Sequence, residues 1–271
     1  MSFSRRAALA GGLAGGLRAS SLPAMAEALR DAAPTASDAA AWTTYEALLR
    51  ARLADAGGGR FDEAGARHAF DLTNAARRTA GSPTVDWHPE LEAAARAHAG
   101  DLARRGYVEH LTPEGFDPSH RFWLLGRTTI GSPSENISYH RGEGPPATPE
   151  HLIERLRRSP GHWANLLRDT HTHAAYAMVR GRTRAWLVGL YARPVATLPD
   201  PLPFEAQGPD IARALRSLPT DLRLRLAVPQ GSRAGRIQGA PPVMQLTAIR
   251  RTEPGRIDIV GGPIFLAGAL G

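Results

Sequence analysis

Residues 159–167 read Ser159-Pro160-Gly161-His162-Trp163-Ala164-Asn165-Leu166-Leu167. A serine followed by proline is typical of the N-cap and first position of a helix, so the stretch predicts a short helix with His162 in its first turn. Two upstream segments hold the other chemistry-bearing residues. They are Glu109-His110, just past a helical pattern, and Ser134-Glu135-Asn136-Ile137, in a Gly/Ser/Pro-rich stretch that we predict to be a loop.

Several other segments have the periodicity of regular structure. Residues 88–106 give the clearest helix, because Pro89 suits the first helical position and Gly106 the position after the end. Residues 174–179 and 185–191 are rich in β-formers and flank a turn, which predicts a hairpin. Apolar residues at helical spacing predict further helices over residues 42–54, 62–78 and 148–158.

The two ends of the chain differ from its middle. Residues 27–60 are expected to be an N-terminal helical extension with a linker. Beyond a proline-rich linker, residues 199–271 are expected to form a small β-rich appendage. Its predicted strands are residues 222–228, 243–249, 256–260 and 264–266.

Residues 1–26 have the pattern of an export signal. Arg5 and Arg6 precede a weakly apolar run over residues 7–17, and Ala24-Met25-Ala26 fits an A-x-A cleavage site. The arginine pair favours a twin-arginine signal over the alternative, an ordinary Sec signal. The mature protein is therefore expected to be periplasmic or secreted. The mature chain has no second hydrophobic span, so we expect no transmembrane anchor in it.

Composition excludes several kinds of chemistry. The sequence has neither Lys nor Cys, so lysine Schiff bases, thiol nucleophiles, thiolate metal sites and disulfides are absent. The formal net charge is +7, and residues 1–26 contribute +3 of it through three arginines. The remaining charge is spread along the chain. A nucleic-acid partner is therefore not expected, since such proteins concentrate positive charge on one element.

His110, Glu135 and His162 are the candidate site residues. Histidine with a carboxylate is a ligand set of catalytic zinc, and the same groups can perform acid–base chemistry. Their separations match no local metal motif. The alternative is structural: each histidine bonds a backbone group, and Glu135 caps a loop amide. His98 is expected to be a core histidine, and His171 is expected on a solvated loop.

A series of short motifs runs from Phe61 to Pro194. They are Asn74-Ala75-Ala76-Arg77, Val85-Asp86-Trp87-His88-Pro89-Glu90-Leu91, His98-Ala99, Gly106-Tyr107-Val108-Glu109-His110, Arg121 with Gly126, Glu135-Asn136-Ile137, Ser159-Pro160-Gly161-His162, and Asn165-Leu166-Leu167. In this order the motifs resemble the CAP superfamily: cysteine-rich secretory proteins, antigen 5 and pathogenesis-related proteins. The resemblance covers about half of the chain and is closest to bacterial exported members.

The resemblance implies an α+β fold, an α-β-α sandwich over residues 61–198 with a cleft. It implies that His110, Glu135 and His162 converge there and can hold a divalent metal such as zinc, with Asn136 in the same cleft. One departure concerns Ser159, which stands where animal members add a second acid. Fewer negative charges would then offset a cation.

Three functions follow from the resemblance. The first is a non-enzymatic binding module, whose cleft takes a divalent metal or a small apolar or peptidic ligand; lipids and envelope proteins are the other expected partners. The second is a metal-dependent hydrolase using the same cleft, although no catalytic residue is assigned. The third is an envelope assembly role, in which residues 199–271 dock a partner.

Overall fold

The structure is a computed structural model that describes residues 34–35, 37–144, 146–217, 223–232, 243–253 and 256–267. The predicted export signal lies outside the described residues. The helices are α2 (Ala39–Arg52), α3 (Glu63–Thr79), α4 (Pro89–Arg105), α5 (Pro118–Leu125), α6 (Pro149–Arg157), α7 (Pro160–Leu167) and α8 (Gly208–Arg216). The strands are β1 (Arg60–Phe61), β2 (Asp86–Trp87), β3 (Thr129–Ile130), β4 (Pro133–Arg141), β5 (His173–Arg180), β6 (Arg184–Ala192), β7 (Ala196–Thr197), β8 (Glu205–Ala206), β9 (Arg223–Ala227), β10 (Val243–Glu253) and β11 (Arg256–Ala267).

The larger sheet has the strand order β1-β5-β6-β4, and β2 adds to β5 in parallel. Its long strands β5, β6 and β4 are antiparallel neighbours. The register pairs Ala192 with both Pro133 and His173. The end of β6 and the beginnings of β4 and β5 therefore lie at the same end of the sheet.

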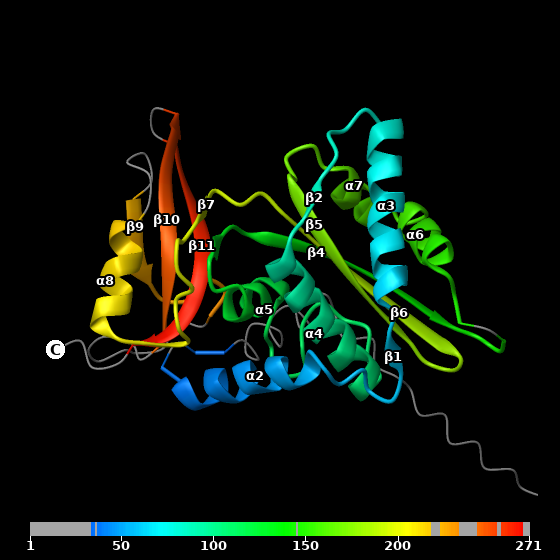
Figure 1. The fold of residues 1–271 in the computed structure, drawn as a ribbon, viewed down its shortest axis with the longest axis horizontal. Coiled ribbons are helices and arrows are strands. Elements are labelled where there is room, and N and C mark those ends of the chain that lie inside the picture. The colour runs from blue at the N-terminus through cyan, green and yellow to red at the C-terminus, as the bar shows by residue number, and fades with distance from the viewer. Residues whose placement is uncertain are drawn as a thin grey trace, which may run out of the picture.

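Helices cover both faces of this sheet (Figure 1). Alternate residues of β5 point to opposite faces: Ala175, Ala177 and Val179 pack in the core under α2, α4 and α5. Tyr176 and Met178 pack in a second core under α3, α6 and α7. The predicted α-β-α sandwich is thus confirmed, and the alternation of side chains along β5 is its physical basis.

Most helix boundaries follow the local signals. The side chains of Asp38, Asp62 and Thr148 accept hydrogen bonds at the N-caps of α2, α3 and α6. Gly106 ends α4 in the left-handed conformation, with φ of 74°. Ser159 occupies the N-cap of α7 as predicted, yet its side chain makes no capping hydrogen bond.

Three predictions about secondary structure were wrong or incomplete. The segment around Glu135 is strand β4 and not a loop; its buried polar residues hide the alternation expected of a strand. Helix α5 was missed, although Asp117 and Pro118 form a capping signal at its start. Helix α8 was also missed within the segment expected to be β-rich.

The C-terminal residues form a second sheet of order β8-β11-β10-β9, packed against α8. Residues 256–267, predicted as two short strands, form the single strand β11. This sheet is joined to the sandwich by a shared core, because Val243 and Ile264 belong to the same hydrophobic cluster as α4 and α5. The Trp123 side chain of α5 lies directly over Gly261 of β11.

Helix α2 is likewise part of the sandwich. Trp42, Tyr45 and Leu49 are buried in the core shared with α4 and α5. The Tyr45 ring stacks on Phe116 with 3.8 Å between centroids. The predicted N-terminal extension therefore contributes to the main core. Within the described ranges, no helix has the length and apolar character needed to cross a bilayer.

Candidate functional site

The structure brings His110, Glu135 and His162 together from three separate elements. His110 lies in the loop after α4, Glu135 in β4 and His162 in the first turn of α7. His110 Nδ1 lies 2.8 Å from Glu135 Oε1. The two imidazole rings lie side by side, with 6.4 Å between their centroids. The three residues match no local metal-binding motif in the sequence, and it is the tertiary structure that places them next to one another.

Glu135 is held by a buried arginine. Its Oε2 accepts a hydrogen bond from Arg121 Nη2 at 2.8 Å, and the two side chains are 1 % and 0 % exposed. Burial opposes ionisation of Glu135, but the charge of Arg121 and hydrogen bonds from Arg121 and His110 lower its pKa to about 2. The carboxylate is therefore ionised at neutral pH and accepts the Nδ1–H of His110.

This hydrogen bond fixes the tautomer of His110. A carboxylate only accepts, so Nδ1 carries the proton and a neutral ring keeps its lone pair on Nε2. The His110 side chain is 49 % exposed, which leaves it accessible to a ligand. His162 is half-buried, and its burial, with the neighbouring His110, lowers its pKa. Two imidazoles with free lone pairs can therefore be available together.

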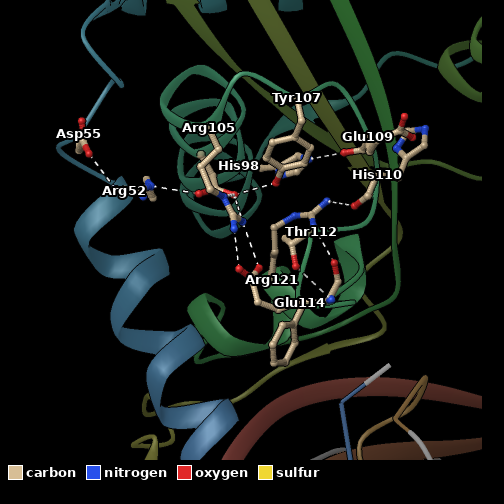
Figure 2. A network of polar contacts seen from close by, with 12 residues as sticks. Arg52, Asp55, His98, Arg105, Tyr107, Glu109, His110, Thr112, Glu114 and Arg121 are labelled. Carbon is tan, nitrogen blue, oxygen red and sulfur yellow. Dashed lines mark hydrogen bonds and ion pairs between the residues drawn. The ribbon is translucent and has the colours of Figure 1, made fainter. Parts of the chain in front are cut away.

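The backbone that carries His110 is fixed from two sides, as Figure 2 shows. Arg121 Nη2 donates to the carbonyl oxygen of His110 at 2.9 Å. On the other side, His98 Nε2 lies 3.0 Å from the carbonyl oxygen of Glu109, so it must be the donor. Burial lowers the pKa of His98 to about 3, and the ring is neutral. The prediction that His98 is a core histidine is confirmed.

A second group of polar contacts anchors the same loop further from the site (Figure 2). Asp101 of α4 is 4 % exposed in its side chain and accepts hydrogen bonds from Arg105 and Tyr107. Arg105 also pairs with Glu114 in the loop, and Arg52 of α2 reaches Asp101 from the other side. The loop is thus tied to α2 and α4 by charge-assisted hydrogen bonds.

Asn136 has a different place from the one expected. It is 1 % exposed, and its Nδ2 donates to the carbonyl oxygen of His162 at 2.8 Å. Its Oδ1 accepts from Asn165 Nδ2 at 3.0 Å. Because these groups are engaged and buried, Asn136 positions helix α7 and has almost no exposed surface to offer a ligand. Asn165, whose role the sequence patterns did not identify, completes this support.

A three-ligand metal site does not fit this geometry. Both carboxylate oxygens of Glu135 are engaged, one by His110 and one by the Arg121 cation. In the part of the chain that the structure describes, no group of three or more His, Asp or Glu side chains is arranged to hold a metal ion. The geometry fits a different role for Glu135, that of a carboxylate hydrogen-bonded to the His110 ring. In other proteins this arrangement orients imidazoles that bind metal ions. His110 and His162 would then be the protein ligands.

His171 departs from its predicted place on a solvated loop. It is 6 % exposed and stacks on Tyr191 with 5.4 Å between ring centroids. Its Nε2 lies 3.3 Å from both Ser134 Oγ and Asn165 Oδ1. The loop 168–172 folds back on the sheet end, which places His171 behind the site.

Comparison with known proteins identifies the domain formed by the middle of the chain. Residues 70–191 match the model of the CAP family, described as the cysteine-rich secretory protein family. This segment is a CAP domain. The matched residues lie within the predicted range 61–198, and they include His110, Glu135 and His162.

Among curated proteins, the CAP domain is similar to the uncharacterized protein YkwD of Bacillus subtilis, with 30% identity over 112 residues. The match covers 40% of this chain and 40% of the relative's length. Solved structures are also similar. An outer surface protein of Borrelia burgdorferi shares 13% identity over 50% of this chain and 98% of its own, with a TM-score of 0.44. A Bacillus anthracis extracellular protein with an SCP domain shares 20% identity, covering 49% of this chain and 41% of its own, with a TM-score of 0.42.

Proposed function

We propose that this protein is an exported binding module whose CAP domain binds a divalent metal ion through His110 and His162. The observation that carries the proposal is the 2.8 Å contact between His110 Nδ1 and Glu135 Oε1. Because this contact directs the lone pair to Nε2 of an exposed ring, His110 is prepared to donate to a cation. His162 supplies a second imidazole beside it.

The charges around the pair also bear on the choice of cation. Glu135 is balanced by Arg121, so the nearest carboxylate contributes little net negative charge. Imidazole nitrogens suit Zn²⁺ and neighbouring transition metals, whereas Ca²⁺ and Mg²⁺ require several oxygens. We therefore expect selectivity for Zn²⁺ over Mg²⁺. With two protein ligands, water or a ligand group would complete the coordination.

The test is calorimetric titration of the purified protein with ZnCl₂. One ion per chain is expected to bind, and His110→Ala or His162→Ala should abolish that event. Glu135→Gln should weaken it by about 10–100-fold, since a supporting carboxylate is lost while both ligands stay. If Glu135→Gln bound zinc as tightly as the wild type, the supporting role of Glu135 would be rejected.

A matched control is available in the same domain. His140 and His151 form another ring pair, with 5.0 Å between centroids. In the described part of the structure, no carboxylate is hydrogen-bonded to either ring. His140→Ala should therefore leave the zinc event unchanged. Loss of binding in this variant, with binding retained in His110→Ala, would refute the proposal.

Export is the second element of the proposal, and it rests on the sequence of residues 1–26. Expression with the natural N-terminus, followed by cell fractionation and mass spectrometry, should recover a protein that begins near Glu27 outside the cytoplasm. Replacing Arg5 and Arg6 by Lys should block export if the route is twin-arginine. A full-length protein retained in the cytoplasm of wild-type cells would contradict export.

A further inference from the structure

A cavity of about 380 Å³ lies between the CAP domain and the C-terminal sheet, apart from the His110–His162 pair. Its walls come from the β3–β4 connection, the loop 168–172, the residues after β6, and β11. Clefts of this size at the junction of two packed units are common places for small-molecule ligands. We refer to it as the junction cleft.

The sheet register explains why these segments meet. Pro133, Ala192 and His173 are aligned across β4, β6 and β5. Ser132 and Arg193 are the next residues outward, so they emerge at the same end of the sheet as the loop before β5. Strand β11 closes the other side, because the amide of Gly131 donates to the carbonyl oxygen of Gly261 at 2.9 Å.

One wall of the junction cleft is rigid and uncharged. His171 lines it and is fixed by its stacking on Tyr191 and by Nε2 contacts of 3.3 Å to Ser134 and Asn165. Burial lowers the pKa of His171 to about 4, assisted by the charges of Arg168 and Arg77. The ring therefore brings no positive charge into the cleft at neutral pH.

The charged groups of the junction cleft are unbalanced. Arg168 and Arg193 line it, and within the described ranges neither guanidinium has a hydrogen bond or an ion pair with an acidic side chain. Asp258 of β11 also lines the cleft and has an interaction of its own. Two arginines and one carboxylate line the cleft, so its lining has an excess of positive charge, and Thr170 lines it as well.

We propose that the junction cleft binds a small ligand through one oxyanion group, a carboxylate or a phosphate. Arg168 and Arg193 hold the oxyanion, since guanidinium groups recognise both chemistries through paired N–H donors. Val195 and Val260 provide an apolar surface for the remainder of the ligand.

The experiment titrates the purified protein with inorganic phosphate and, in a separate arm, with acetate, at constant ionic strength. Binding is followed by NMR shifts of backbone amides. Saturable shifts confined to the segments that line the cleft are expected with at least one probe, and the stronger probe identifies the preferred oxyanion. Absence of saturable shifts at the cleft with both probes would overturn the proposal.

Variants make the assignment specific. Arg168→Gln or Arg193→Gln should weaken binding about tenfold each, the effect of losing one charge-assisted hydrogen bond. Arg193→Lys should retain part of the affinity. Arg141→Gln is the matched control, because Arg141 is an exposed arginine at the opposite end of β4. An equal loss in Arg141→Gln would show a net-charge effect and refute the cleft as the site.

The oxyanion proposal and the metal proposal can be tested independently of each other. His110→Ala should leave oxyanion binding unchanged, and Arg193→Gln should leave the zinc event unchanged. Thermal unfolding of each variant checks that the fold is retained. These Arg side chains are exposed, so the substitutions are not expected to unfold the protein.

Discussion

Arg121 and Glu135 form a buried ion pair, with 2.8 Å between Nη2 and Oε2. Burying two charges is costly, and the cost is offset only where the remaining donors and acceptors are satisfied. Here Arg121 also donates to the carbonyl oxygens of His110 and Phe116, while Glu135 accepts from the His110 ring. Among the described residues, Arg121 Nε has no hydrogen-bond partner, so the compensation is incomplete. One pair therefore fixes both the side chain and the backbone of His110.

Removing the cation of this pair should be strongly destabilising. Arg121→Met leaves the Glu135 carboxylate buried and unpaired, and we expect a loss of about 3–5 kcal/mol in the free energy of unfolding. Urea denaturation measures it. As a control, Arg158→Gln removes an exposed pair with Glu154 on α6 and should cost less than about 0.5 kcal/mol. Similar losses of unfolding free energy in both variants would show that burial of the Arg121–Glu135 pair does not set the size of the effect.

The same pair predicts sensitivity to acid. The pKa of Glu135 is about 2 in the folded protein, against an ordinary value of 4.5. A depressed carboxyl pKa stabilises the fold above about pH 4.5, and this stabilisation of roughly 3 kcal/mol is lost as the pH falls from 4.5 towards 2. Urea midpoints at pH 7, 5, 4 and 3 should show this decline. It should be smaller in Glu135→Gln and unchanged in a variant of the exposed Glu143.

His171 predicts a separate decline at higher pH. Burial lowers its pKa from 6.5 to about 4, so the folded state holds the neutral ring. The unfolded chain takes up a proton below pH 6.5, and stability falls as the pH decreases from 6.5 to 4. Between pH 7 and 5, His171→Gln should lose about 2 kcal/mol less than the wild type. The exposed His151→Gln should keep the wild-type slope.

The contact between Trp123 and Gly261 should be intolerant of added volume. A Cβ at Gly261 would lie 2.3 Å from Trp123 Cζ2, and that ring is fixed by its 2.8 Å hydrogen bond to the carbonyl oxygen of Gly131. Gly261→Ala is expected to cost about 1–3 kcal/mol, measured by thermal unfolding. Gly208→Ala meets no atom within 4 Å and should be neutral or slightly stabilising. Equal effects would show that α5 and the C-terminal sheet are not tightly packed at this contact.

Most helices of the CAP domain, though not α5, were predicted because their signals are local. Capping residues and apolar periodicity placed α3, α4, α6 and α7 within a few residues, and β-formers around a turn placed the β5–β6 hairpin. Strand β4 was not predictable from its pattern. Asn136 and Ser138 are buried there by tertiary contacts, so polar residues occupy positions where alternation would require apolar ones.

The amino-acid sequence establishes which chemical groups are available, namely histidines and carboxylates without lysine or cysteine, and local capping residues set the ends of most helices. What each group does depends on the contacts that it makes in the folded protein. Arg121 and Glu135 are 14 positions apart in the sequence, and His110 and Glu135 are 25 apart; the packing of α5 and β4 brings them together. Local periodicity carries no information about such pairings, and for this reason the supporting role of Glu135 became visible only in the fold.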